Sequence, residues 1–197
     1  MFKDLYIYYI LSVFLLFSPI FSSNSYSDNN DKKSVNIDVI EQNYDYLIIK
    51  YSINHYDTRL IEYNDEIYTD IILDGEPDYI IKGAPKLPHV NRSVIIPDNS
   101  SSSIEILDTR YIEINNLNII PSKGNPKRNI DISELPYIKG STYVQDAFFP
   151  SIIAELRNPY ILRDFRGQVI QLNPFQYNPI TSTLAVYNKI ILKIEFN

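Results

Sequence analysis

Cysteine is absent from the 197-residue sequence, and histidine occurs only twice. Without cysteine the chain has no disulfide framework, no thiolate metal site and no nucleophilic thiol. The two histidines, His55 and His89, do not form a metal-ligand spacing of the His-x-x-x-His kind, and each is expected at the surface or in a turn. The sequence therefore predicts no cofactor, no metal site and no catalytic residue of these classes.

Basic residues are also few, since 18 Lys and Arg stand against 24 Asp and Glu, for a net charge of -6. Nucleic-acid binding needs clustered Lys and Arg to neutralise phosphates, and no such cluster stands out. The acidic residues Asp70, Asp74 and Glu76 could suggest a calcium site, but they lack the spacing of an EF-hand loop. A solvated turn is the expected alternative, and no nucleic-acid partner is predicted.

Only one long apolar run occurs, at residues 10–21, after Lys3 and before the serine-rich segment 22–27. About a dozen residues are too few to span a bilayer of ~30 Å as a helix, and small residues suit signal peptidase. Residues 1–27 are therefore predicted to be a signal peptide, which implies a secreted, extracellular protein with no membrane contact after cleavage. The alternative is an N-terminal membrane anchor. Residues 28–34 are expected to be a flexible lead.

Long helices are disfavoured after residue 30, because twelve prolines interrupt the chain and no window keeps a 3.6-residue period for three turns. Short apolar segments recur at a spacing of roughly ten residues, which is typical of a β-sandwich. We therefore predict one all-β domain over residues 35–197, an antiparallel and jelly-roll-like β-sandwich. Strands are expected at residues 34–40, 44–53, 68–73, 79–82, 89–96, 104–107, 110–114, 168–172 and 190–196.

The clearest strand is the last one. Ile190, Leu192 and Ile194 alternate with polar or exposed positions, which is the period of a strand with one solvated face. Residues 168–172 form a second short apolar segment, and the prolines and polar residues of 178–183 indicate a turn between the two. We expect these two strands to pair as an antiparallel hairpin at the centre of a sheet.

Several short motifs along the chain, taken in their order and spacing, identify a resemblance to a known family. They are Gly83-Ala-Pro-Lys-Leu-Pro-His-Val-Asn-Arg-Ser, Ile120-Pro-Ser-Lys-Gly, Leu135-Pro-Tyr, Phe148-Phe-Pro, Leu162-Arg-Asp-Phe-Arg-Gly-Gln-Val, Pro174-Phe-Gln-Tyr-Asn-Pro-Ile-Thr and Val186-Tyr. In order and spacing these motifs resemble the N-terminal prodomain of gingipain-type cysteine peptidases, family C25. The resemblance covers residues 83–196 and is weak or absent over 28–82.

The resemblance implies the prodomain of a secreted cysteine endopeptidase zymogen, which keeps the peptidase latent and assists its folding. The implied partner is the catalytic domain of a C25-type peptidase, in cis or in trans. Because the chain lacks cysteine, it cannot itself be that peptidase. The family pattern also makes residues 151–156 a strand, although they are the best short helical candidate. It continues beyond Asn197, so we expect a truncated C-terminus.

The segment 121–136 is the least strand-like part after the N-terminal region, and its 16 residues exceed a usual connection. In gingipain-type zymogens the resembling loop presents a basic residue to the specificity pocket of the peptidase. An ungapped count places Arg128 at this inhibitory position, next to Lys127, with the Arg128-Asn129 bond near the catalytic cysteine. The alternative is that Lys123, Lys127 and Arg128 are ordinary solvated loop charges.

Two other functions remain open from the sequence. The chain could be a secreted β-sandwich binding module for carbohydrate or protein, with exposed aromatic side chains that stack on the ligand. The candidates are Tyr143, Phe148, Phe149, Phe165 and Tyr177, although such residues also favour strands and core packing. A hydrolase with paired carboxylates is the third possibility, for which 24 acidic residues offer too many candidates to select a pair.

Overall fold

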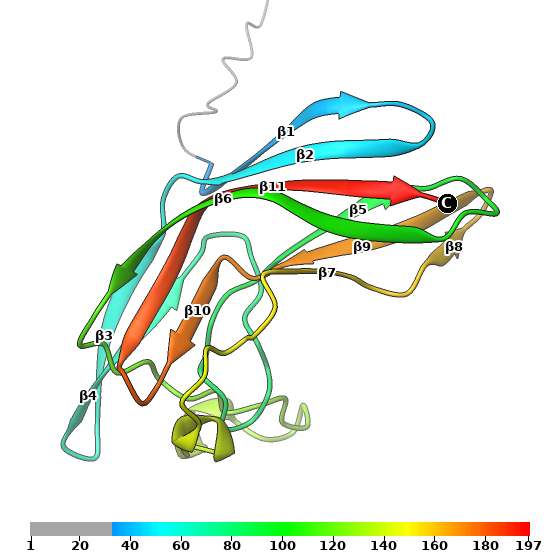
Figure 1. The fold of residues 1–197 in the computed structure, drawn as a ribbon. Helices are drawn as coiled ribbons and strands as arrows, with labels where there is room; N and C mark the ends of the chain where they lie inside the picture. Colours follow the sequence, from blue (N-terminus) through cyan, green and yellow to red (C-terminus); the bar gives the residue numbers. More distant parts are fainter. Residues whose placement is uncertain (1–32) are drawn as a thin grey trace, which may run out of the picture. The chain divides into compact units, whose positions relative to one another are not determined.

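The computed structural model describes residues 33–197, which form antiparallel sheets joined by long loops (Figure 1). The largest sheet has five strands, with the 14-residue strand β11 at its centre. β11 pairs with β2 and β10 along one edge and with β6 along the other. The strands of this sheet are β1 (Val35–Gln42), β2 (Tyr46–Ile53), β6 (Ser102–Ile114), β10 (Phe175–Asn178) and β11 (Thr183–Phe196).

A four-stranded sheet forms the second layer, and a hairpin forms a further two-stranded sheet whose second strand is largely buried. The sheet consists of β5 (Val90–Ile95), β7 (Ala154–Leu156), β8 (Tyr160–Leu162) and β9 (Phe165–Leu172), and β9 pairs with the other three. The hairpin consists of β3 (Asp57–Tyr63) and β4 (Glu66–Ile72). The helical segments within residues 33–197 are the short 3-10 turns η2 (Ile132–Glu134) and η3 (Ser141–Val144). The predicted antiparallel all-β class is confirmed.

The core lies between the two sheets and follows from the alternation of apolar residues. On β11, Ile190, Leu192 and Ile194 are buried while the residues between them are half exposed, as the sequence predicts. β2 alternates in the same way, and Ile170 and Leu172 of β9 close the core from the second sheet. Each such side chain stabilises the fold by about 1.5–3 kcal/mol relative to an exposed position, so the layers are held mainly by apolar burial.

The predicted hairpin between residues 168–172 and 190–196 is wrong. β9 and β11 belong to different sheets, and the strand that forms the hairpin with β11 is β10, which is not among the predicted strands. β10 has only four residues and lies between two prolines, Pro174 and Pro179, so the sequence shows no apolar run long enough to predict a strand there. Alternation identifies a strand and its buried face, but it contains no information about the neighbouring strand.

Other strand boundaries also differ from expectation. The segment 59–67, for which the sequence predicts no strand, belongs to the β3–β4 hairpin, whose turn residues Asn64 and Asp65 have φ of 51° and 61°. Positive φ at both residues is the conformation of a tight hairpin turn, which asparagine and aspartate tolerate well. The two expected strands 104–107 and 110–114 are one strand, β6, which begins two residues earlier, at Ser102. Residues 79–82 form no strand.

The two histidines differ in their surroundings. His55 is exposed, with Nε2 3.1 Å from a carboxylate oxygen of Asp57, as expected for a surface residue. His89 instead is half-buried and its ring lies 4.8 Å from that of Tyr79. Burial lowers the pKa of His89 below its usual value, because the charged form is poorly solvated there. His89 is therefore partly buried, in the irregular segment before β5, whereas His55 is exposed as expected.

No helix within residues 33–197 is long and apolar enough to cross a membrane. The predicted signal peptide, residues 1–27, and most of the predicted flexible lead lie outside the described residues.

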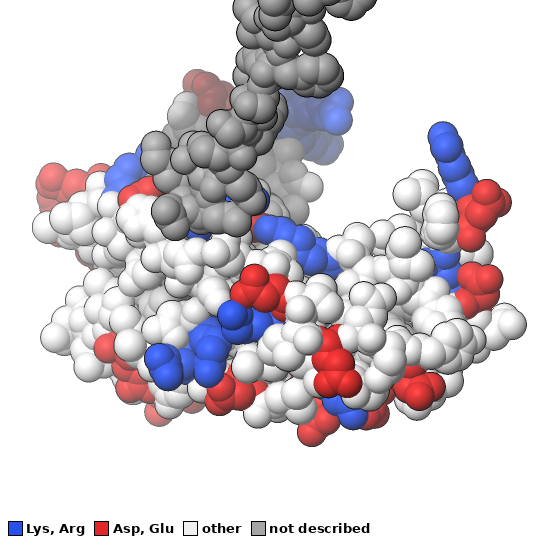
Figure 2. All heavy atoms as spheres, turned by 90° about the horizontal axis from the view of Figure 1, so that it is seen from above, with Lys and Arg blue, Asp and Glu red and all other residues white. Residues whose placement is uncertain are grey.

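On the described face drawn in Figure 2, Lys and Arg side chains are interspersed with Asp and Glu. Ion pairs such as Lys50 with Asp38 and Lys189 with Asp108 show the same local balance of charge.

Candidate functional site

The segment 83–84 is hydrogen bonded to the residues that lead into the loop 121–136 (119–124, the first leg) and, through Gly83, to those that lead out of it (131–140, the second leg). Ser122 exchanges two backbone hydrogen bonds with this segment, at 2.9 Å to Gly83 and 2.8 Å to Ala84. On the other side, the amide of Gly140 donates to the carbonyl of Gly83 at 2.8 Å. Gly83 has φ of 79°, and a Cβ there would lie 3.0 Å from the backbone of Gly140. The Gly83-Ala-Pro motif is therefore the clamp that brings both ends of the loop together.

The first leg of the loop is also hydrogen bonded to a layer of buried backbone. Ile120 donates to the carbonyl of Thr69 at 3.1 Å and accepts from the amide of Lys86 at 2.9 Å. Ile119 and Ile120 are fully buried, and the hydroxyl of Tyr143 donates to the carbonyl of Ile119 at 2.7 Å. These contacts make the base of the loop part of the buried core.

The second leg is tied to the β3–β4 hairpin by an ion pair. Nζ of Lys139 lies 2.6 Å from a carboxylate oxygen of Glu66, which also accepts from the side-chain amide of Asn118 at 3.2 Å. The hydrogen bond from Lys139 lowers the pKa of Glu66 to about 2, with further contributions from Tyr68 and Asn118. Glu66 thus remains ionised and joins both legs of the loop to the hairpin.

A buried carboxylate, Asp70, pairs with two basic side chains near the loop. Its side chain is 1% exposed, and its oxygens lie 2.7 Å from Nζ of Lys86 and 2.8 Å from Nη2 of Arg59. Lys86 also reaches Asp78 at 3.1 Å. The expected solvated turn is therefore wrong for Asp70 and also for Glu76, whose side chain is 6% exposed and paired with Arg92, whereas Asp74 is exposed in a turn. No group of three or more potential metal ligands occurs in the part of the chain that the structure describes.

A cavity of about 340 Å³ separates this ion-pair cluster from the loop. The loop contributes one wall, and the opposite wall comes from β3, β4 and the segment 78–86. The charged groups on the wall are already paired with one another, as Asp70 is with Lys86. The residues around it are Arg59, Asp70, Asp78, Tyr79, Ile80, Lys86, Ile120, Ser122, Lys123, Gly124, Ile132, Ser133 and Tyr137.

Inside the loop, Lys123 connects the two legs. Its Nζ donates to the carbonyl of Ile132 at 2.9 Å and to that of Ser133 at 3.3 Å, and it lies 4.2 Å from the centre of the Tyr137 ring. The Tyr137 ring in turn packs edge-on against Tyr63 of β3, with centroids 5.2 Å apart. The alternative prediction, an ordinary solvated loop charge, is therefore wrong for Lys123.

The tip of the loop presents Arg128 to solvent. Residues 127–130 form a turn closed by a 3.0 Å hydrogen bond from the amide of Ile130 to the carbonyl of Lys127. Lys127, Arg128 and Asn129 are all exposed. Within residues 33–197 no hydrogen bond or ion pair engages the side chain of Lys127 or Arg128, unlike that of Lys123. The Arg128 guanidinium is therefore available to a partner, with all its donors free.

Just after the tip, Asp131 begins the 3-10 turn η2. Its carboxylate accepts from the backbone amide and the hydroxyl of Ser133, at 2.8 and 2.7 Å. These two hydrogen bonds lower the pKa of Asp131 below its usual value. This local capping fixes the backbone conformation of the residues that directly follow the tip, 131–134.

The aromatic residues considered for ligand stacking do not form a common surface. Tyr143 and Tyr177 are buried, at 9% and 1% exposure, and Phe148 and Phe149 pack against the core. Phe165 alone among the five is exposed. Core packing, the alternative stated for these residues, therefore accounts for four of them.

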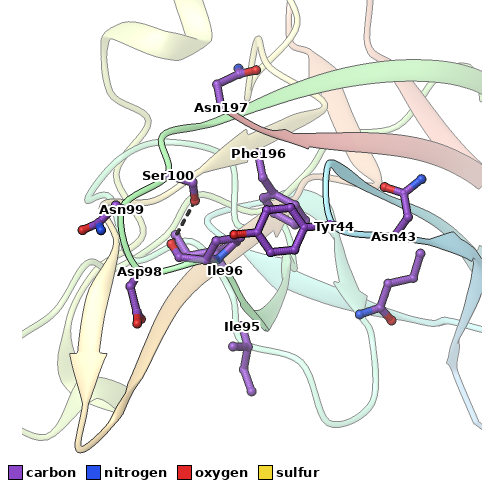
Figure 3. A pocket seen from close by; sticks show the side chains of 11 residues that line it. Asn43, Tyr44, Ile95, Ile96, Asp98, Asn99, Ser100, Phe196 and Asn197 are labelled. Carbon is purple, nitrogen blue, oxygen red and sulfur yellow. Dashed lines mark hydrogen bonds between the residues drawn. The ribbon is translucent and has the colours of Figure 1, made fainter.

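A second hollow, of about 700 Å³, opens beside the turn between β1 and β2 (Figure 3). Tyr44, Ile96 and Phe196 lie at its centre in this view, and Ser100 donates to the carbonyl of Pro97 at 2.9 Å. Asp98 is the one carboxylate-bearing side chain among its described lining residues. A pair of carboxylates, as a glycosidase-like hydrolase requires, is therefore not found in this hollow.

Comparison with known sequences relates the chain to peptidase propeptides. The family model described as Propeptide_C25 matches residues 29–197, and so includes residues 29–82, in which the motifs gave little resemblance. Gingipain R1 of Porphyromonas gingivalis is 44% identical over 114 residues, which are 58% of this chain and 12% of the relative. Gingipain R2 of the same species is 41% identical over 114 residues and 16% of its length. The chain thus spans a small part of these relatives.

Solved structures show the same architecture. A chain from the complex of Porphyromonas gingivalis RgpB pro- and mature domains superposes with a TM-score of 0.78 and 28% identity, covering 82% of this chain and 85% of the other. A structure that concerns the zymogenic latency of gingipain K gives a TM-score of 0.71 at 15% identity, over 82% of this chain and 92% of the other. The second likeness concerns the fold alone.

Proposed function

Because this chain belongs to the C25 propeptide family, we propose that it is the prodomain of a gingipain-type cysteine endopeptidase zymogen. In this role it keeps the peptidase latent through the loop 121–136 and assists its folding. The partner is the catalytic domain of a C25-type peptidase, joined in cis or bound in trans. The chain contributes no catalytic group, because it contains no cysteine.

The observation that carries the proposal is the geometry of the loop. Its base is fixed to Gly83 and Ala84, while Arg128 at its tip is exposed and has no partner among the described residues. A guanidinium can form a forked, bidentate contact with a carboxylate in a specificity pocket. The Arg128-Asn129 bond would then lie near the catalytic cysteine of the partner, and inhibition would result from occupancy of the active site.

The proposal is tested by adding the purified protein to a mature Arg-specific gingipain-type peptidase and measuring hydrolysis of a small arginine substrate. Active-site occupancy predicts a rise in apparent KM with an unchanged kcat, since substrate and loop exclude each other. A peptidase that prefers lysine serves as the specificity control and should be inhibited more weakly. Unchanged kinetics at micromolar protein would contradict the proposed function.

We further propose that residues 1–27 direct export, so that the protein is secreted. The support is the sequence pattern of a basic start, a short apolar run and a serine-rich end. The mature protein would then begin near Tyr26 or Asp28. Mass spectrometry of the exported protein should find this new terminus, and recovery of an intact Met1 terminus would contradict the proposal.

A further inference from the structure

Lys123 connects the first leg of the loop to the residues that follow its tip. It belongs to the first leg, next to Ser122, whose backbone is bonded to Gly83 and Ala84. Its ammonium group donates to the carbonyls of Ile132 and Ser133, which follow the tip. The bonds therefore span nine and ten residues of the chain and close the loop around the exposed tip.

We infer that Lys123 is a positioning residue for inhibition, which holds the tip in the shape that a peptidase active site accepts. The inference rests on the proposed function and adds a determinant to it. Lys123 itself touches no partner in this role. It acts through the Ile132 and Ser133 carbonyls, and its effect reaches Arg128 by limiting the conformations of the segment between them.

The need for such a residue follows from the other contacts of the tip. Residues 125–134 have the turn at 127–130 and the Asp131 cap, and both connect neighbours in the sequence. Contacts of that kind set local shape but do not hold the segment against the fold. Ordering a free loop on binding costs conformational entropy for every residue fixed, so a loop held beforehand binds more tightly.

Lysine suits this position chemically. An ammonium has three donors, and here two carbonyls and the face of the Tyr137 ring surround it. The carbonyls belong to η2, where the exposed carbonyls of a short helical turn favour a cation. Tyr137 is itself held by Tyr63 of β3, so the ring gives the ammonium a fixed surface to pack against.

A loosened loop should also become a better substrate. In hydrolysis the partner's thiolate attacks the carbonyl carbon of Arg128, and the C–N bond to Asn129 breaks. The nitrogen takes up a proton and leaves as a new amino terminus. Water then cleaves the thioester, which restores the thiol and releases a carboxylate at Arg128. When both legs of the loop are held, the two cleaved ends stay close together, so re-formation of the Arg128–Asn129 bond competes with release. When the loop is loose, the new amino terminus diffuses away.

The test compares Lys123→Met with Lys127→Met in the 197-residue chain. Both changes remove one positive charge from the same loop, but Lys127 has no side-chain partner among the described residues. Hydrogen–deuterium exchange of residues 128–134 is measured without any peptidase. The inhibition constant and the rate of cleavage at Arg128 are then measured against a mature Arg-specific cysteine peptidase. Lys123→Arg is included because arginine can still donate to both carbonyls and cover the ring.

We expect Lys123→Met to speed exchange in 128–134, to weaken inhibition about ten- to thirtyfold and to accelerate cleavage, because the loop must be ordered on binding. Lys127→Met should change inhibition by less than about threefold. Lys123→Arg should inhibit nearly as well as the parent protein, because it keeps the hydrogen bonds to the two carbonyls. Thermal unfolding should be nearly the same in all three, which separates loop order from global stability.

Unchanged exchange in Lys123→Met would overturn the inference whatever the inhibition assay shows. Faster exchange with an unchanged inhibition constant would also overturn it, provided that Arg128→Ala abolishes inhibition in the same assay. If Arg128→Ala and the parent protein are equally poor inhibitors, the proposed function has failed, and the role of Lys123 in inhibition is rejected with it.

Discussion

Replacing Arg128 with alanine is expected to weaken inhibition of an Arg-specific cysteine peptidase by about thirty- to a thousandfold, or ~2–4 kcal/mol. The change removes a charged side chain that would be desolvated in the specificity pocket and would leave the pocket carboxylate unpaired. In the free protein Arg128 is exposed, so its removal should not alter the folded state. The measurement is the inhibition constant, accompanied by the denaturation midpoint to show that the fold is intact.

The matched variants are Arg128→Lys and Lys127→Ala. Lysine keeps the charge but cannot make the forked contact, so Arg128→Lys should fall between alanine and the parent protein. Lys127 is an exposed neighbour with no side-chain partner in residues 33–197, so Lys127→Ala should change inhibition by less than about fivefold. Lys123 is unsuitable as a neutral control, because its ammonium is bonded inside the loop.

Other rankings would have distinct meanings. If the Lys127 substitution has the largest effect, the partner is Lys-specific or the inhibitory position is displaced by one residue. If Arg128→Ala, Arg128→Lys and Lys127→Ala all inhibit as well as the parent, the loop is not the inhibitory element. The proposed mechanism would then be rejected, and another face of the sandwich would have to bind the peptidase.

Replacing Asp70 with alanine is expected to destabilise the fold by about 2–4 kcal/mol. Removing one partner of a buried ion pair leaves the other charge without compensation, and a fully buried case costs about 3–5 kcal/mol. The lower range applies here because Lys86 is 28% and Arg59 63% exposed, so water can partly solvate both cations. Urea denaturation measures the free energy of unfolding directly.

The control for Asp70 is Asp38, whose carboxylate lies 2.7 Å from Lys50 on an exposed strand surface, with side-chain exposures of 56% and 35%. Asp38→Ala should cost less than about 1 kcal/mol, as is usual for surface ion pairs. A combined Asp70→Leu and Lys86→Met protein should recover part of the lost stability, since no buried charge is then left unpaired. If Asp70→Ala is as mild as Asp38→Ala, the buried ion-pair cluster does not stabilise the fold.

The sequence by itself determined those features that depend on one segment at a time. Alternating apolar residues identified the last strand and its buried face, because a strand places successive side chains on opposite faces whatever its partners are. Prolines and the lack of a helical period excluded long helices and led to the all-β class. Short motifs in a particular order identified the propeptide family, and a long polar segment identified the loop.

The tertiary structure alone decided which segments meet. β11 pairs with β10 instead of β9, because strand partners depend on loop closure and packing between distant residues, which alternation does not encode. Asp70 is buried because Lys86, 16 residues later, and Arg59, on the neighbouring strand, neutralise its charge. Gly83 and Gly140, 57 positions apart, form the clamp of the loop because their backbones touch. A lysine in a polar loop has the same local sequence signal whether it is solvated or bonded, so only the fold distinguishes Lys123 from Lys127.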